Sequence, residues 1–295
     1  MKIITWNMNY WQNTHIYDSN IDRFKLPGYK DNIEEVNVWI NNCKKYIEKL
    51  NFDILLLQEI NPMVLFGEKY EKSDDNQYEF IKGNNIIIYH ELYNELISEK
   101  LEGNYWGNAI IVKNSFDAVI VIQPDNNDYY GRNGLMFYDI VRKYGPSLSL
   151  INYYNKKNRN KNFYSMPYEM KEDLKGMVKE NGRFTIFAGD FNSDKDRDLS
   201  SKIFFDFIEE LGFENFTIGE EFMNTMVAEA KPYPNDKIYL KNIDKEIIKN
   251  IKCQKLTDTN IKYSDHYPIK IEIIENDEIE KDRKFYINKN FWDVI

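Results

Sequence analysis

The chain has 295 residues, 42% of them hydrophobic and 15% aromatic, which is enough to bury one large core. Its formal net charge of -9 excludes binding of nucleic acid through bulk positive charge, although a local basic patch or a metal can still attract a polyanion. The two cysteines, Cys43 and Cys253, lie in no Cys/His cluster, which argues against a zinc site and against a disulfide scaffold.

The first half of the chain is predicted to contain mostly strands and one long helix. A short apolar run at 2–7 predicts a first strand, and apolar residues on one face of 32–50 predict a helix. The continuous apolar run at 53–57 is typical of a strand buried on both faces. Apart from the strand predicted at 85–89, residues 61–104 show little periodicity. Further strands are predicted at 85–89, 108–112, 118–122, 135–141 and 148–153.

The second half of the chain continues this pattern with two more helices. They are predicted at 168–179 and 199–211, the latter with Asp198 or Ser200 near its N-cap and Gly212 at its end. Strands are predicted at 184–188, 237–240, 251–256 and 267–274. Many strands with few helices, and no repeat or linker, favour one α/β domain built as a layered sandwich. We assign it to residues 1–274 and interpret 275–295 as a charged and then aromatic C-terminal extension.

Several predicted strands end in polar side chains directly after a hydrophobic run. In α/β sheets such strand ends converge on one crevice, so we expect these groups to meet. Each polar group taken alone is explained by a cap or a turn, but several together indicate a site. The stretches that follow a strand are Trp6-Asn7-Met8-Asn9, Gln58-Glu59 and Gly189-Asp190-Phe191-Asn192, whereas Asn235-Asp236 and Ser264-Asp265-His266 come directly before a strand.

Some of these groups are suited to binding a magnesium ion. Mg²⁺ prefers oxygen ligands, keeps several waters, and is often held by one or two carboxylates plus a substrate phosphate. Glu59 is the first candidate ligand, with Asn7 or Asn9 beside it and Asp265 as a further acid. The sequence therefore predicts a Mg²⁺ site at these strand ends.

The remaining groups are suited to hydrolysis of a phosphoester. Asp190, in a tight glycine turn, can act as the carboxylate base for a water that attacks phosphorus. Asn192 can hold phosphate oxygens without competing for a metal. His266, oriented by a second carboxylate such as Asp236, can stabilise the developing charge.

The order of these motifs resembles the endonuclease/exonuclease/phosphatase superfamily. Gly189-Asp190-Phe191-Asn192 followed by Ser264-Asp265-His266-Tyr267-Pro268 is the most specific match, and the matching stretches span nearly the whole chain up to about residue 274. The resemblance implies a four-layer α/β sandwich with two mixed sheets packed face to face and helices outside. It also implies phosphoester hydrolysis with Mg²⁺ or Mn²⁺. It assigns the same roles as above to Glu59, Asn7, Asp190, Asn192, Asp236, His266 and Asp265.

One position departs from the pattern of many members, which carry a second histidine at the end of the central strand. Here residues 150–154 read Leu-Ile-Asn-Tyr-Tyr. The chain is in this respect more similar to the exonuclease III and AP endonuclease branch, which has a tyrosine that contacts the phosphate. The resemblance assigns that role to Tyr154, whose hydroxyl can donate a hydrogen bond to a phosphate oxygen or protonate a leaving group. The alternative is a packed aromatic residue in a tyrosine-rich chain.

A basic stretch follows Tyr154 directly. Its side chains either contact flanking phosphates of a nucleic acid or form a solvated loop. The proposed contacts are Lys156, Lys157, Arg159 and Lys161. The favoured function is a metal-dependent nuclease that acts on DNA more than RNA by activated-water attack. The alternatives are a phosphatase or phosphodiesterase acting on phosphoinositides or other small phosphoesters, and a non-catalytic binding protein on the same fold.

The N-terminal residues lack the apolar segment of a signal peptide, and no apolar run approaches the ~20 residues that span a bilayer. We therefore expect a cytoplasmic protein without membrane insertion.

Overall fold

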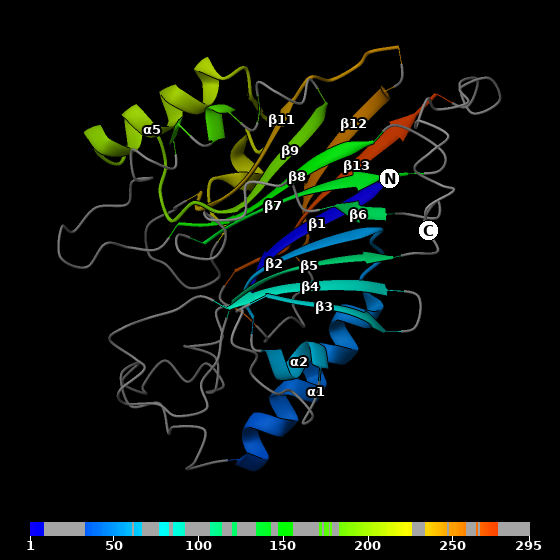
Figure 1. The fold of residues 1–295 in the computed structure, drawn as a ribbon. Helices are drawn as coiled ribbons and strands as arrows, with labels where there is room; N and C mark the ends of the chain where they lie inside the picture. The colour runs from blue at the N-terminus through cyan, green and yellow to red at the C-terminus, as the bar shows by residue number, and fades with distance from the viewer. Residues whose placement is uncertain are drawn as a thin grey trace.

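Two β-sheets packed face to face form the centre of the protein in a computed structural model of the chain (Figure 1). The structure describes residues 1–8, 33–60, 62–66, 77–82, 85–91, 107–113, 120–122, 134–142, 147–155, 171–172, 174–176, 178, 183–225, 234–246, 248–257, 264 and 266–276. All statements below on the structure concern these residues.

The first sheet has seven strands in the order β12-β13-β1-β2-β5-β4-β3. Neighbours β1 and β2 are parallel and all other neighbours in this sheet are antiparallel. Because β1 and β2 run the same way, their C-terminal ends lie at the same edge of the sheet. The strands are β1 (Lys2–Asn7), β2 (Ile54–Ile60), β3 (Gln77–Lys82), β4 (Asn85–Glu91), β5 (Gly107–Lys113), β12 (Ile248–Lys255) and β13 (Ile269–Glu275).

The second sheet has six strands in the order β10-β11-β9-β8-β7-β6. Its one parallel pair is β8 with β9, and the other neighbours are antiparallel. The ends of β8 and β9 therefore also share an edge. The strands are β6 (Ile120–Ile122), β7 (Leu135–Val141), β8 (Leu148–Tyr154), β9 (Phe184–Asp190), β10 (Glu214–Asn215) and β11 (Asp236–Lys241).

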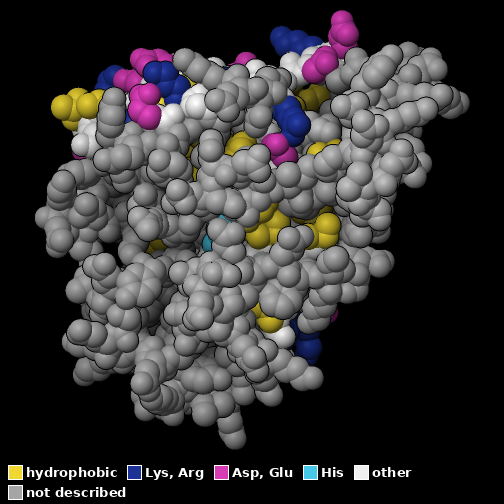
Figure 2. All heavy atoms as spheres, in the orientation of Figure 1, with side chains coloured by type: hydrophobic (Ala, Val, Ile, Leu, Met, Phe, Trp, Pro, Cys, Tyr) yellow, Lys and Arg dark blue, Asp and Glu magenta, His cyan; other side chains and the backbone are white. Residues whose placement is uncertain are grey.

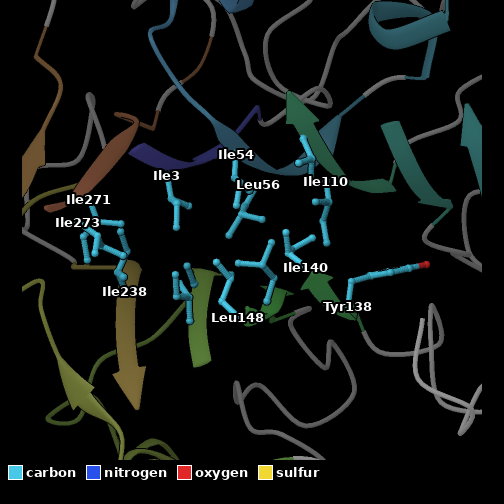
Figure 3. Close-up of a cluster of buried hydrophobic side chains, with 14 of the residues drawn as sticks. Ile3, Ile54, Leu56, Ile110, Tyr138, Ile140, Leu148, Ile238, Ile271 and Ile273 are labelled. Atoms are coloured by element: carbon cyan, nitrogen blue, oxygen red, sulfur yellow. The ribbon is translucent and has the colours of Figure 1, made fainter. Parts of the chain in front are cut away.

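Helices cover the outer face of each sheet, as Figure 1 shows. Helices α1 (Ile33–Lys49) and α2 (Pro62–Phe66) lie on the first sheet, and α5 (Leu199–Glu210) lies on the second. The side chains divide accordingly into three buried apolar clusters: one between the sheets, one under α1 and α2, and one under α5. Figure 3 shows the central cluster, where Ile3 and Leu56 of the first sheet face Leu148 of the second. The predicted four-layer sandwich is confirmed.

The alternation of side chains along β1 explains how one strand serves two clusters. Ile3 points between the sheets, whereas Ile4 and Trp6 point toward the helices. This is the two-residue period of a strand that is buried on both faces. Burial of such side chains stabilises the folded state by roughly 25 cal/mol per Å² of apolar surface removed from water. These clusters are therefore the main source of stability.

Most predicted elements lie within two or three residues of the observed ones, including α5, whose N-cap Asp198 accepts a hydrogen bond from the Ser201 amide at 2.7 Å. Three differences stand out. β2 continues through Glu59 to Ile60 instead of ending at 57, and the weakly patterned 61–104 contains α2 and the edge strand β3. β3 is an edge strand whose only neighbour in the sheet is β4, and its sequence mixes polar and apolar residues.

The outer surface of α5 carries charges of both signs, which Figure 2 shows at its upper left. Lys195 forms ion pairs with Asp206 and Glu209, and Lys202 forms one with Asp206. This helix surface therefore offers no basic stripe to a polyanion.

Of the predicted C-terminal extension, Glu275 belongs to β13 and residues 277–295 lie outside the described residues. The division of the chain at residue 274 stays a prediction. Among the helices that the structure describes, none is both long and apolar enough to cross a membrane.

Candidate active site at one edge of the two sheets

A polar layer lies between the sheets at the edge where β1 and β2 end. Asn7 pairs in register with Gln58, and His90 of β4 pairs with Asn108 of β5, which lies opposite the end of β2. All four side chains are buried. The preceding layers on the same strand faces are apolar apart from Thr5 of β1, so the polar groups mark the end of the apolar core.

β9 carries Asp190 to this edge as its last residue. Gly189 has a φ of 148°, and a Cβ at this position would lie 1.8 Å from the Tyr153 carbonyl oxygen. Only glycine therefore allows β9 to approach β8 this closely. Asn192 also has a left-handed backbone, with φ of 50°, and its carbonyl accepts a hydrogen bond from Arg197 at 2.8 Å. The turn holds Asp190 and Asn192 side by side.

Asp190 is buried and accepts hydrogen bonds from the first sheet and from the turn that follows its own strand, β9. Asn7 of the first sheet donates its Nδ2 to Asp190 Oδ2 at 2.7 Å. Asn192 donates its backbone amide to Oδ1 at 2.7 Å and its Nδ2 to Oδ2 at 2.9 Å. The donors are all neutral, so they orient the carboxylate without neutralising its charge.

His266 and Asp236 form a second buried pair at the same edge. The Nδ1 of His266 lies 2.7 Å from Oδ2 of Asp236, and this contact fixes the orientation of the ring. Trp6 donates its Nε1 to the His266 carbonyl at 3.0 Å, and Ser264 donates its hydroxyl to the Asn7 carbonyl at 2.6 Å. The segment that carries His266 is thereby attached to β1.

Glu59 lies on a β-bulge at the end of β2. Leu57 pairs with Ala109 and Ile60 pairs with Gly107, so Gln58 and Glu59 together oppose the single residue Asn108. Glu59 has a φ of 48°, which is unusual for a residue with a side chain and is typical of strain at functional positions. Gln58, the residue before Glu59, is the register partner of Asn7, so Glu59 lies at the same edge of the sheet as Asn7.

Tyr154 lies at the end of β8, next to Asp190. The two residues are register partners on parallel neighbours, so their side chains leave the second sheet on the same face. Tyr154 is partly buried and packs against the apolar cluster under α1 and α2. The backbone of Tyr154, the residue predicted to contact the phosphate, therefore lies beside that of Asp190, the predicted base.

The donor set at this edge fits a divalent cation. Ligand atoms of Asp190, Asp236 and His266 all lie within 4.8 Å of one another, and Asp236 Oδ1 is buried without a hydrogen-bond partner in the part of the chain that the structure describes. Carboxylate and amide oxygens from Asp190, Glu59 and Asn7 are hard ligands of the kind that Mg²⁺ and Mn²⁺ prefer. The pairing of His266 with Asp236 commits Nδ1 to that carboxylate.

The structure thus brings Asn7, Asp190, Asn192, Asp236 and His266 together, with Glu59 and Tyr154 at adjoining strand ends. The other predicted site residues lie outside the described residues: Asn9, Asp265, Lys156, Lys157, Arg159 and Lys161. Their predicted roles stay predictions.

Two buried residues near the site were not predicted from the sequence. Asn152 of β8 bonds to the first sheet, and its place two residues before Tyr154 was the only available signal, since a strand has a period of two. Lys237, beside Asp236, lies over the Phe205 ring at 5.3 Å and donates its ammonium to the Pro234 carbonyl. Burial lowers the pKa of Lys237 to about 8, although Asp194, Asp236 and Asp190 oppose this shift.

Two mixed sheets enclosed by helices, with an Asp–His pair and a buried Asp–Asn turn at one edge, define the class of DNase I-like proteins. The sequence matches the Endonuclease/Exonuclease/phosphatase family over residues 4–206, and the chain belongs to this family. Members of the family are typically hydrolytic phosphoesterases and generally use divalent metals. No curated protein matches the sequence at a significant level.

Several solved structures share the fold over nearly their whole length. The endonuclease domain of TRAS1, a telomere-specific non-LTR retrotransposon, is 16% identical with a TM-score of 0.54, covering 92% of this chain and 97% of that one. A humanized D. rerio TDP2 is 17% identical with a TM-score of 0.51, covering 93% and 98%. The 3' phosphatase NExo from Neisseria, bound to a product DNA hairpin, is 16% identical with a TM-score of 0.52, covering 93% and 99%.

Burial of Asp190 predicts a pH-dependent stability of the metal-free protein. Burial raises the pKa of Asp190 to about 6, with Asp236 adding to the rise and His266, Asn192 and Asn7 opposing it. The folded state therefore holds this proton more tightly than the unfolded chain does. The resulting stabilisation is complete below the ordinary pKa of ~4 and is lost as the pH rises through about 6.

Urea unfolding of the wild type and Asp190→Ala, at a series of pH values from ~4.5 to ~7 without metal, measures this effect. The free energy of unfolding of the wild type, relative to that of the variant, should fall by about 2 kcal/mol over this pH range. A difference that stays constant with pH would show that Asp190 has an ordinary pKa.

Proposed function

We propose that the chain is a divalent-metal-dependent phosphodiesterase that hydrolyses nucleic acid, DNA in preference to RNA, by attack of an activated water. The observation that carries this proposal is the buried Asp190 carboxylate, held by the neutral donors Asn7 and Asn192, with ligand atoms of the His266–Asp236 pair within 4.8 Å. A carboxylate that remains available as a base, next to an oriented imidazole, is suited to water attack on a phosphoester.

Each residue has a distinct task in this proposal. Asp190 accepts the proton of the attacking water, or orients that water, and Asn192 donates a hydrogen bond to a phosphate oxygen. His266, oriented by Asp236, donates toward the charge that develops on the phosphate. Glu59 is the principal metal ligand, supported by Asn7, Asn9 and Asp265. When bound, Mg²⁺ or Mn²⁺ supplies positive charge that polarises the phosphate oxygens.

Nucleic acid is the first substrate class to test for two reasons. The basic stretch at Lys156, Lys157, Arg159 and Lys161 follows the site strand, where positive side chains would meet phosphates that flank the scissile bond. The solved structures that share the fold include a retrotransposon endonuclease and a phosphatase bound to a DNA hairpin. We further propose that the protein acts in the cytoplasm.

A substrate panel tests the substrate class. Labelled duplex DNA, single-stranded RNA, a 3'-phosphorylated oligonucleotide and a phosphoinositide are each incubated with the protein and Mg²⁺. We expect cleavage within the DNA and slower cleavage of the RNA. Phosphate release from the phosphoinositide without cleavage of nucleic acid would support a small-molecule phosphatase, and inactivity on all four substrates would support a binding protein.

Tyr154→Phe is expected to lower kcat for phosphodiester cleavage by roughly 10- to 100-fold, because the variant keeps the ring and loses only the hydroxyl. The matched control is Tyr153→Phe, the same change one residue earlier, where the side chain faces the cluster under α5. Steady-state kinetics on a labelled duplex measure both variants. Equal rates for Tyr154→Phe and the wild type would assign Tyr154 to packing alone.

A further inference from the structure

We propose that Asn152 is a positioning residue that holds the two halves of the site in register, an inference that rests on the proposed function. The candidate metal ligand Glu59 belongs to the first sheet, whereas Asp190 and Tyr154 belong to the second. Between the sheets lies mainly an apolar cluster. Apolar contacts are non-directional, so they hold the sheets together without fixing how the sheets align at the site.

Asn152 supplies directional contacts across this interface. It is fully buried in β8, and its Nδ2 donates to the Leu57 carbonyl at 3.0 Å and to the Ala109 carbonyl at 2.9 Å. Its Oδ1 accepts a hydrogen bond from Gln58 Nε2 at 2.6 Å. One side chain of the second sheet therefore bonds to two neighbouring strands of the first, β2 and β5.

These contacts fall at the β-bulge that carries Glu59. Leu57 and Ala109 are the last regular pair before the bulge, and Asn152 bonds to the carbonyls of both. A bulge interrupts the ladder, and buried carbonyls there need another donor. Gln58, bonded to Asn152, is the residue directly before Glu59. The bulge and its left-handed Glu59 are thus anchored from the opposite sheet.

The same side chain is close in register to the other half of the site. Asn152 lies two residues before Tyr154 on the same strand face, and its register partner Ala188 lies two residues before Asp190. Because strands are stiff over two residues, the position of Asn152 sets those of Tyr154 and Asp190. Asn152 thereby fixes the separation between the proposed metal ligand and the proposed base.

Mn²⁺ binding and thermal unfolding of Asn152→Leu, measured without substrate, test the inference. Leucine has a similar size and removes all three hydrogen bonds to the first sheet. The matched control is Tyr138→Phe, which removes another buried contact between the sheets, the 2.7 Å contact of Tyr138 with His90 of β4, a strand that does not border β2. Both variants should unfold at lower temperature than the wild type. Only Asn152→Leu should weaken Mn²⁺ binding, by roughly 10- to 100-fold in a titration followed by electron paramagnetic resonance.

Each outcome decides the matter. Equal Mn²⁺ affinity in folded Asn152→Leu and in the wild type would overturn the inference and leave the proposed function intact. Absence of Mn²⁺ binding by the wild type would overturn both. If Asn152→Leu does not fold, Gln58→Met breaks the same junction from the first sheet, and wild-type Mn²⁺ affinity in that variant would overturn the inference.

Discussion

Replacing His266 with alanine is expected to lower kcat for phosphodiester cleavage by about 10³-fold or more. The chain has three histidines, and the resemblance to the family predicts Tyr154 at the position where many members carry a second histidine. His266 is buried and held by Asp236 at 2.7 Å, which presents one oriented imidazole at the site. Its removal deprives the developing phosphate charge of its oriented donor.

Two controls separate this effect from a loss of structure. Thermal unfolding of His266→Ala should show a folded protein, and added imidazole should restore part of its activity because the vacated space borders Asp236. Asp236→Asn leaves the His266 ring present but removes the carboxylate that orients it. We therefore expect a smaller loss of kcat than in His266→Ala. Near-normal turnover in His266→Ala would exclude His266 from the chemistry.

The second large effect is expected for Asp190→Asn, which should lose about 10³-fold or more in kcat. Asparagine has the same shape but cannot accept a proton from water. Both carboxylate oxygens of Asp190 also accept hydrogen bonds, Oδ1 from the Asn192 amide and Oδ2 from the side chains of Asn7 and Asn192. In either orientation, the side-chain NH2 group of the variant faces one of these N–H donors, so a hydrogen bond is replaced by a repulsive contact between two donors.

Asp194→Asn is the matched control for this variant. Asp194 lies four residues further along the same loop, and its carboxylate accepts a hydrogen bond from the Asp196 amide outside the site. We expect wild-type kinetics for Asp194→Asn. Activity of Asp190→Asn within about tenfold of the wild type would contradict the assignment of Asp190 as the base.

Local sequence predicted the strands and their polar ends well, because both depend on neighbouring residues. The run at 2–7 corresponds to β1, and the strand predicted at 184–188 continues as β9 to Asp190, which lies at the edge where Asn7 lies. The grouping of these polar ends follows from topology: parallel neighbours end at a shared edge. The membership in the family and the four-layer fold could therefore both be predicted.

The bulge at Glu59 and the contacts of Asn152 could not be predicted in the same way. The apolar run 53–57 gives no indication that β2 continues with one extra residue, because a bulge is defined by the partner strand β5. The hydrogen bonds of Asn152 depend on how two sheets far apart in the sequence are stacked. Such features are set by tertiary packing and leave no local pattern.

The most direct test of the central claim is the nicking of a supercoiled plasmid in the presence of Mg²⁺, followed by gel electrophoresis. We predict conversion of the plasmid to its open circular form by the wild type, complete loss of this activity with EDTA, and no conversion by Asp190→Asn. Nicking that persists at the wild-type rate in EDTA, or in purified Asp190→Asn, would contradict a metal-dependent phosphodiesterase centred on Asp190.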